Sequence, residues 1–169
     1  MNIRILKQED AQVYQSLRLR ALQTNPEAFG STYEREVAFT QEMVEERIRA
    51  TEDSYGLGAF DEKGELLGVV RFVRETGMKE KHKGTIYGMY VAPETRGQGV
   101  GKALLQEVIS RAKDFDGVEQ IRLQVVSTNE SAKKLYQSLG FETYGVEPRA
   151  LNHNGQYLDE DLMLLFLNK

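Results

Sequence analysis

Residues 91 to 105 carry the features needed to bind an anion. They read VAPETRGQGVGKALL, in which the end of a strand is followed by a basic turn containing Gly97, Gly99 and Gly101, and then by an amphipathic helix. Amides in the first turn of a helix lack acceptors within that helix, and the helix dipole places partial positive charge at the same end. Arg96 adds a cation at the mouth of the turn. The pattern predicts a site for a phosphorylated ligand.

Two better-known phosphate loops do not fit the spacing. A Walker A loop has four residues between its first glycine and the Gly-Lys pair, and a hydroxyl residue after the lysine. Here three residues separate Gly97 from Gly101, and Ala103 follows Lys102. The dinucleotide fingerprint G-x-G-x-x-G also fails, because the glycines here are spaced G-x-G-x-G. The remaining alternatives are another phosphate-bearing ligand or a glycine-rich turn that binds nothing.

Two sequence blocks resemble a known family. The run RGQGVG, which starts at Arg96, resembles motif A of the GNAT superfamily of acyl-CoA-dependent N-acetyltransferases, Arg/Gln-x-x-Gly-x-Gly/Ala. The block QVVSTNESAKKLYQSLGF resembles the family's motif B, whose characteristic positions are filled here by Asn129, Ala132, Tyr136, Gly140 and Phe141. The resemblance covers residues 65 to 167, and the first third of the chain is less diagnostic.

Hydrophobic periodicity and this resemblance together predict the fold. Period-two patterns favour strands at 2–6, 55–60, 66–74, 85–91, 121–125, 141–146 and 161–167, and helical spacing favours 8–22, 40–50, 100–114 and a segment after Asn129. Gly88 interrupts one strand pattern, as a glycine at a bulge does. We expect an α/β fold of the GNAT type, with a mixed sheet of about seven strands, a splayed central parallel pair and about four helices on both faces. Residues 1–169 would form a single acetyltransferase domain.

The composition narrows the class of protein. The net charge of −4 over 169 residues argues against nucleic-acid binding. Because the chain has no cysteine, disulfides, thiolate metal sites and an acyl-cysteine intermediate are excluded. The two histidines lack metal-ligand spacing, so we expect no metal. No apolar leader or membrane-length apolar run is present, which predicts a cytoplasmic protein without a membrane partner.

The resemblance implies that acetyl-CoA is the co-substrate. In the family, acyl-CoA lies where two parallel strands part, which here would be the strands ending at Val91 and Val126. The pantetheine arm would bind the main chain of the first strand, and the pyrophosphate would rest on the glycine-rich turn. The cofactor-binding residues expected on this basis are Met89, Tyr90, Val91, Arg96, Gly97, Gln98, Gly99, Val100, Gly101, Lys102 and Asn129.

Tyr136 is the expected catalytic residue. A tyrosine stays protonated at neutral pH and can donate to a departing thiolate, although the same residue could also be a core aromatic. The general base stays open, because the strand before motif A reads TIYGMYV and has no carboxylate. Asp159 and Asp161 could orient an amine. On the acceptor side we expect Tyr33, Glu34 and Tyr87.

These features predict an N-acetyltransferase that moves an acetyl group from acetyl-CoA to a primary amine. The absence of cysteine favours direct attack within a ternary complex. The acceptor could be a small-molecule amine or a protein amino group, and homodimers are frequent among the proteins the chain resembles. The alternative is a non-catalytic acyl-CoA-binding regulatory module.

Overall fold

The computed structural model describes residues 1–168, and its centre is a seven-stranded sheet in the order β1-β2-β3-β4-β5-β7-β6. The strands are β1 (Asn2–Ile5), β2 (Ser54–Phe60), β3 (Leu66–Arg74), β4 (Lys83–Val91), β5 (Gln120–Val126), β6 (Glu142–His153) and β7 (Gln156–Phe166). Neighbouring strands are antiparallel except β4 and β5, which are parallel. The expected mixed sheet with a central parallel pair is confirmed.

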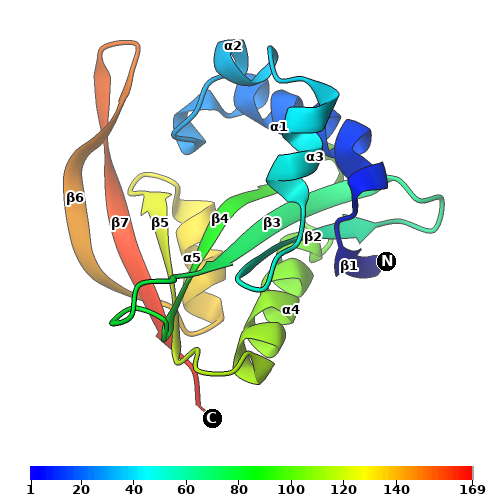
Figure 1. Ribbon diagram of the computed structural model, residues 1–169. Helices are drawn as coiled ribbons and strands as arrows, with labels where there is room; N and C mark the ends of the chain where they lie inside the picture. The colour runs from blue at the N-terminus through cyan, green and yellow to red at the C-terminus, as the bar shows by residue number, and fades with distance from the viewer. Residues whose placement is uncertain (169) are drawn as a thin grey trace.

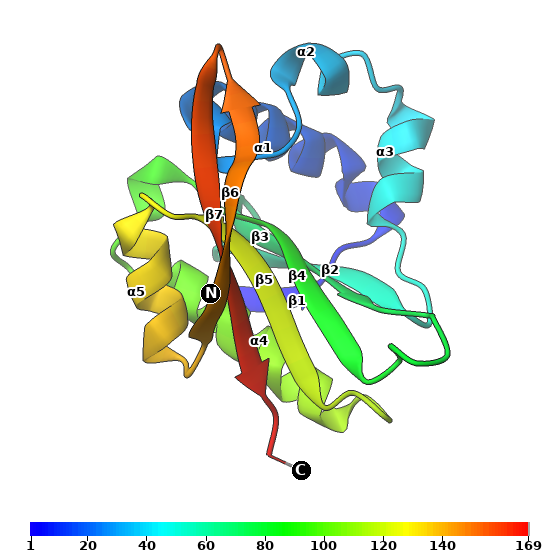
Figure 2. The ribbon, with the colours of Figure 1, turned by 90° about the vertical axis from the view of Figure 1, so that its left-hand side faces the viewer.

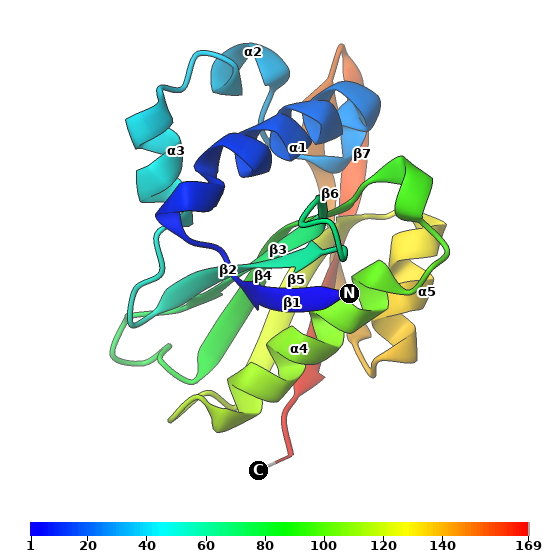
Figure 3. The same ribbon diagram turned by 90° about the vertical axis from the view of Figure 1, so that its right-hand side faces the viewer.

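Five α-helices cover the two faces of the sheet (Figures 1 and 3). They are α1 (Ala11–Thr24), α2 (Tyr33–Glu36), α3 (Gln41–Ile48), α4 (Val100–Asp114) and α5 (Glu130–Ser138), with short 3-10 helices at Gln8–Asp10, Pro26–Ala28 and Pro93–Thr95. Helices α1 to α3 lie on one face, and α4 and α5 lie on the other. The sequence predicted about four helices, and the one it missed is α2, a single turn too short to show periodicity.

The main core lies between the sheet and α4. Leu104, Leu105, Val108 and Ala112 are fully buried in a cluster with residues of β2 to β5. They recur at helical spacing, so one stripe of α4 is apolar and packs on the sheet. This packing fixes the start of α4, and therefore the glycine-rich turn before it, against the end of β4.

Strands β4 and β5 part after a short parallel ladder. Their pairing runs only from Lys83 opposite Gln120 to Thr85 opposite Arg122, although both strands continue beyond it. On its other side, β4 carries a bulge at Gly88 and Met89, where its register with β3 shifts. Gly88 has a φ of 60°, which favours glycine. The expected splay of the parallel pair and the bulge at Gly88 are both confirmed.

The C-terminal hairpin is longer than the sequence predicted. The prediction placed strands at 141–146 and 161–167, whereas β6 and β7 extend to a two-residue turn at Asn154 and Gly155. Both turn residues have positive φ, 52° and 83°, as tight hairpin turns require. Strand β6 is mostly exposed on both sides, so it lacks the apolar alternation that identifies a strand. The tip of the hairpin rises to the level of α1 and α2 (Figure 2).

Most other boundaries agree closely with the sequence. The bounds of β3 are as predicted, and α4 begins at Val100. Thr40 and Asn129 cap α3 and α5 through their side-chain oxygens. Within residues 1–168, no helix combines the length and apolar character needed to cross a bilayer.

Candidate active site

A cleft of about 680 Å³ lies between the end of β4, the start of α4 and the start of α5. Its lining includes Met89, Tyr90, Val91, Arg96, Gly97, Gly99, Val100, Gly101, Lys102 and Asn129. Of the residues the sequence assigned to the cofactor, Gln98 alone is absent from this lining; its side chain is exposed. The structure therefore brings the other assigned residues to one place.

The three glycines of the turn serve two different purposes. Gly97 and Gly99 have φ of 80° and 82°, and a Cβ on either would meet nothing within 4 Å. Their role is conformational, because L-residues with side chains adopt this region at a cost. A Cβ on Gly101 would instead lie 3.0 Å from Met89 Cε and 3.4 Å from Leu135 Cδ2. Gly101 therefore allows the start of α4 to approach β4 and α5 closely.

The main-chain amides of this turn are unpaired. Gly99 is the N-cap of α4 and offers no side chain to cap it. Within the described residues, the amides from Gly97 to Lys102 have no protein acceptor, and the first bonded amide is that of Ala103, which donates to Gly99 O. A run of unpaired N–H groups at the positive end of a helix dipole is an anion-binding cradle.

Arg96 is held at the rim of this cradle. Its Nε donates to the carbonyl oxygen of Val91 at 3.1 Å, and Nη2 donates to Asn25 Oδ1 at 3.1 Å. The guanidinium also lies over the ring of Tyr90, whose hydroxyl is 3.0 Å from that of Thr24. Arg96 itself is exposed, so its charge is available to an anion at the turn.

Tyr136 lies at the meeting point of α5 and the parted strands. It is 7% exposed, and its ring packs edge-on against Phe141 at a centroid distance of 5.9 Å. Burial raises the pKa of Tyr136 to about 12. Among residues 1–168, its hydroxyl makes no protein hydrogen bond, and the residue lines a second cleft. The side chain is thus packed like a core aromatic and yet has a hydroxyl with no protein partner.

Asn129 serves as a helix cap and also faces the clefts. Its Oδ1 accepts from the amide of Ala132 at 3.3 Å, which caps α5. Asn129 lines both clefts, and its side-chain nitrogen donates to nothing within the described part of the chain. The amide nitrogen is therefore left for a ligand.

The second cleft, of about 870 Å³, opens where β4 and β5 part and extends to residues of α1, α3, β6 and β7. Tyr87 lines it and is 51% exposed. Tyr33 and Glu34, which the sequence assigned to the acceptor, line neither of the two clefts, and Glu34 is exposed. Their acceptor role stays a prediction. The acidic residue of α2 that turns inward is Glu36, which is fully buried.

Glu36 holds two arginines of this cleft in place. Arg18 donates from Nε at 2.9 Å and from Nη2 at 3.0 Å, and Arg47 donates from Nη1 at 2.6 Å. Burial alone would raise the pKa of Glu36, but hydrogen bonds from Arg18 and Ser31 and the charges of Arg18 and Arg47 lower it to about 2. The carboxylate is therefore ionised at neutral pH and fixes both guanidinium groups.

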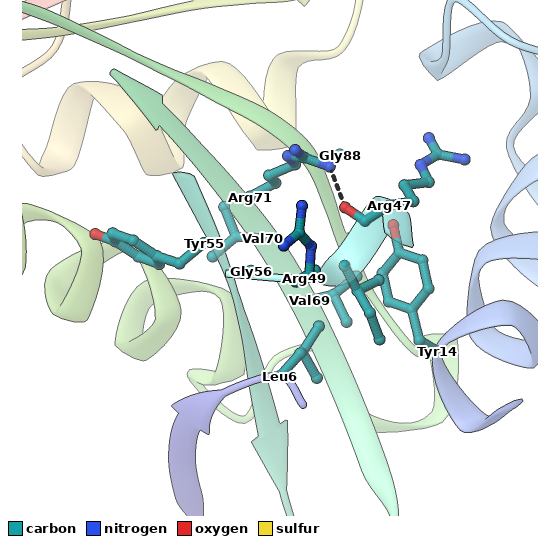
Figure 4. A pocket seen from close by; sticks show the side chains of 11 residues that line it. Leu6, Tyr14, Arg47, Arg49, Tyr55, Gly56, Val69, Val70, Arg71 and Gly88 are labelled. Carbon is teal, nitrogen blue, oxygen red and sulfur yellow. Dashed lines mark hydrogen bonds between the residues drawn. The ribbon is translucent and has the colours of Figure 1, made fainter. Parts of the chain in front are cut away.

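A third arginine, Arg71 on β3, lies beside Gly88 (Figure 4). Its Nη1 donates to the main-chain oxygen of Arg47 at 2.5 Å. The residues drawn in Figure 4 line a small cavity of about 10 Å³. Four of them, Tyr14, Arg47, Arg71 and Gly88, also line the larger cleft. That volume suits one water at most, so the small cavity is a recess behind the arginines.

The acidic residues near the end of β5 have separate roles. Asp161 is buried and accepts from Ser127 Oγ at 2.6 Å and from Lys133 Nζ at 3.1 Å. Asp159 accepts from the amide of Arg149. Neither Asp159 nor Asp161 lines a cleft, whereas Glu160 between them does. Burial and the nearby charge of Glu147 raise the pKa of Glu160.

The sequence did not predict four residues that line the larger cleft, Arg18, Arg47, Arg71 and Glu160, or Glu36, which holds two of these arginines in place. They come from separate elements and share no local motif. Strand alternation was the one available signal, because it places Glu160 on the opposite face from its two aspartate neighbours. In the described part of the chain, no group of three or more His, Asp or Glu side chains is placed to hold a metal ion.

Comparisons with known proteins agree with this geometry. The model of the Acetyltransferase (GNAT) family matches residues 18–141. The L-methionine sulfoximine/L-methionine sulfone acetyltransferase of Pseudomonas aeruginosa is 34% identical over 113 residues, which are 66% of this chain and 64% of that protein. The L-amino acid N-acetyltransferase AaaT of Escherichia coli is 33% identical over 73 residues, which are 43% of this chain and 45% of that protein. The aligned region thus spans less than two thirds of either relative.

Solved structures show the same fold. An acetyltransferase of the GNAT family from Streptococcus pneumoniae superposes with a TM-score of 0.86 at 23% identity and covers 99% of each chain. A putative acetyltransferase from Salmonella typhimurium with its cofactor acetyl-CoA has a TM-score of 0.84 at 22% identity, over 100% of this chain and 95% of that one. Because the family model spans most of the chain and includes both the parted strands and the glycine-rich turn, the chain belongs to the acetyltransferase family known as GNAT.

Proposed function

We propose that the protein is an acetyl-CoA-dependent N-acetyltransferase that acts on a primary amine by direct attack within a ternary complex. One observation carries the proposal: β4 and β5 part beside a turn whose amides from Gly97 to Lys102 are unpaired. A parted strand offers main-chain groups to a ligand that contains amides, and the turn offers them to a diphosphate. Coenzyme A contains both kinds of group.

The residues of the smaller cleft would hold the cofactor along its length. The amides from Gly97 to Lys102 would bind the diphosphate, with Arg96 as an added cation. The edge of β4 at Met89 and Val91 would bind the pantetheine arm, because this edge has no partner on β5. The side-chain nitrogen of Asn129 would be a further donor. The thioester would then reach the gap between the strands, where Tyr136 lies.

In the reaction, the amine must first lose a proton to become a nucleophile. Its nitrogen lone pair forms a bond to the thioester carbonyl carbon, the C–S bond breaks, and the electron pair leaves with sulfur. The nitrogen loses a second proton and sulfur gains one, so one proton is released overall. With its pKa near 12, the Tyr136 hydroxyl is a weaker acid than a thiol. The Tyr136 hydroxyl therefore stabilises the thiolate by donating a hydrogen bond. It passes its proton to sulfur only if it receives another proton at the same time.

A purely regulatory acyl-CoA-binding module is less well supported. Such a module needs the cofactor cleft alone. This chain also has a second cleft, of about 870 Å³, which opens where the strands part, and the hydroxyl of Tyr136 has no protein partner within the described residues. The names of the Pseudomonas and Escherichia relatives, both acetyltransferases, favour the enzyme as well.

Calorimetric titration and a thiol-release assay would test the proposal. We expect acetyl-CoA to bind with a Kd in the micromolar range, about −8 kcal/mol. We also expect free thiol to appear at a rate that depends on an added amine. If acetyl-CoA does not bind at millimolar concentration, the whole proposal fails. If it binds but no amine in a broad panel releases thiol, the regulatory alternative replaces the enzyme.

A further inference from the structure

The larger cleft has an excess of positive charge on one wall. Within residues 1–168, the basic residues that line it are Arg18, Arg47, Arg71 and Arg122, and the one acidic residue is Glu160. Arg122 is already paired with Glu75 at 3.1 Å. Arg18 and Arg47 share the single carboxylate of Glu36. One positive charge of that pair, and the charge of Arg71, are therefore left without a carboxylate in the described structure.

Arg71 is the arginine of this cleft that has no carboxylate partner among the described residues. It is half-buried, and its only hydrogen bond among the described residues is the one from Nη1 to the main-chain oxygen of Arg47. Its Nε and Nη2 donors have no acceptor in that part of the chain. A half-buried guanidinium with free donors at a cleft is available to pair with an anion. The planar guanidinium fits a carboxylate in particular, because it can donate two parallel hydrogen bonds.

The free donors lie close to the point of reaction. Arg71 lies beside Gly88, and Arg18 Nη1 is 3.8 Å from where a Cβ on Gly88 would be. Gly88 is part of the bulge from which β4 departs from β5. An anion bound here would sit next to the gap that the thioester enters. An acceptor with a negative charge near its reacting amino group would fit this placement.

Glu160 supplies the opposite charge within the same cleft. It is half-buried, lies on β7 opposite Val126 at the end of β5, and lines the cleft together with Tyr136. No cation is paired with it in the described structure. A carboxylate in this position suits an ammonium group and can take the proton that the ammonium must lose before attack.

We propose that the acceptor is a primary amine that carries a carboxylate next to its amino group, the carboxylate bound by Arg71 and the ammonium by Glu160. The inference rests on the proposed acetyltransferase function and goes beyond it by naming the chemical class of the acceptor. Arg18 completes the anion site, and Glu36 positions Arg18. The proton taken by Glu160 passes to solvent when product leaves, which accounts for the one proton released in the reaction.

Matched acceptors provide the test. Each common L-α-amino acid would be assayed by thiol release beside its α-carboxamide and its decarboxylated amine, with the wild-type protein and with Arg71→Gln. We expect the wild type to prefer the carboxylate form in kcat/KM. Arg71→Gln should lower kcat/KM for that form about 10- to 100-fold, the cost of losing a charged hydrogen bond, and leave the carboxamide unchanged. Arg111→Gln, a change in a half-buried pair on α4 that lines neither cleft, is the control.

Glu160→Gln gives the complementary result. Because Glu160 is proposed to bind the amino group common to all three forms, this variant should lower kcat/KM for each by a similar factor of about 10 to 100. Glu142→Gln, an exposed change on the neighbouring strand β6, is its control. Calorimetry should show the same Kd for acetyl-CoA in both site variants as in the wild type.

Three outcomes would overturn the inference. One is thiol release with decarboxylated amines or polyamines but with none of the amino acids. Another is an Arg71→Gln variant in which kcat/KM falls equally for the carboxylate and the carboxamide forms. The last is a variant that weakens acetyl-CoA binding and leaves acceptor preference intact, which would assign Arg71 to the cofactor. In each case the wild type would still bind acetyl-CoA, so failure of the acceptor class is distinguishable from failure of the proposed function.

Discussion

The two clefts at the parted strands are built in different ways. The smaller one presents main-chain amides from Gly97 to Lys102, a single stretch of chain. The larger one presents side chains that α1, α3, β3 and β7 bring together from distant parts of the sequence. Main-chain donors suit a ligand that stays the same, since no substitution removes them. Side-chain donors can be exchanged one at a time, which suits an acceptor that differs between related proteins.

The two clefts also differ in what holds them rigid. The turn before α4 is fixed by glycine conformation and by close packing at Gly101. In the arginine wall of the larger cleft (Arg18, Arg47 and Arg71), Arg18 and Arg47 are fixed by one buried carboxylate, Glu36, which has 0% exposure. Removing a single side chain's charge should therefore damage the second arrangement much more than the first. The following variants test this contrast.

The largest effect is expected for Glu36→Gln. The variant leaves Arg18 and Arg47 without a counter-charge, and breaking a buried ion pair in this way costs about 3–5 kcal/mol. Because Arg47 is 30% exposed, we expect the low end, a loss of about 3 kcal/mol in the free energy of unfolding. Denaturation by urea measures it, with the exposed Glu46→Gln on α3 as the control.

The same residue makes a pH-dependent contribution. The pKa of Glu36 falls from its ordinary value of 4.5 to about 2 in the folded protein, so its contribution is complete above pH 4.5. It is lost as pH falls from 4.5 through 2, because the folded state resists the protonation that the unfolded state accepts. Glu36→Gln should lose less stability than the wild type across that interval. Parallel curves for the two proteins would contradict the assignment.

Tyr136→Phe should lower kcat about 100-fold, the low end of what a positioned proton donor contributes. The Kd for acetyl-CoA and the free energy of unfolding should not change, since the hydroxyl makes no protein hydrogen bond in the described structure. Tyr55→Phe is a matched control: burial also raises the pKa of Tyr55 to about 12, and its hydroxyl is buried without a partner. An unchanged kcat in Tyr136→Phe would make Tyr136 structural.

Gly99→Val should weaken acetyl-CoA binding about tenfold. A β-branched residue at a φ of 82° costs about 1–2 kcal/mol, and the strain is relieved by shifting the amides that bind the diphosphate. Gly64→Val is the control, because Gly64 has a φ of 84°, also with open space around it, in the turn between β2 and β3. Both variants should lose similar stability by thermal melting. Equal affinity for acetyl-CoA in the two would rule out the turn as the binding site.

The smallest effect is expected for Arg96→Gln. Arg96 is exposed, and exposed charge pairs contribute about 0.2–1 kcal/mol, so the Kd should rise about two- to threefold. Screening should remove the difference at high salt, since the Debye length falls to about 3 Å at 1 M. Calorimetry at low and high salt checks this. A difference that persists at high salt would mean that Arg96 shapes the turn rather than attracting the anion.

The contrast between the clefts also explains what could be predicted from sequence. The cofactor turn has local rules, in which glycine spacing implies backbone conformation and a helix start implies free amides, so it was predicted with Gln98 as the one residue outside the cleft. The arginine wall has no local rule. Its members become neighbours only when α1, α3 and β3 pack together. Because α2 is a single turn, the sequence could not show that Glu36 faces inward.

The fold shows the same limit. Elements with one buried face, such as α4 and β3, were predicted nearly to the residue. The predicted β6–β7 hairpin was too short. Because β6 is exposed on both sides, it is held by its pairing with β7 and has no apolar pattern that would identify it as a strand. Glu160 lies just before the strand predicted at 161–167, and its place in the cleft depends on that pairing.

Amide chemical shifts of the nitrogen-15-labelled protein, followed during titration with acetyl-CoA, test the central claim most directly. We expect saturable shifts that are largest for the amides from Gly97 to Lys102, with smaller ones along β4 at Met89 and Val91. Saturation with the largest shifts elsewhere, or no shift at millimolar ligand, would contradict the claim that the unpaired amides of this turn hold the cofactor.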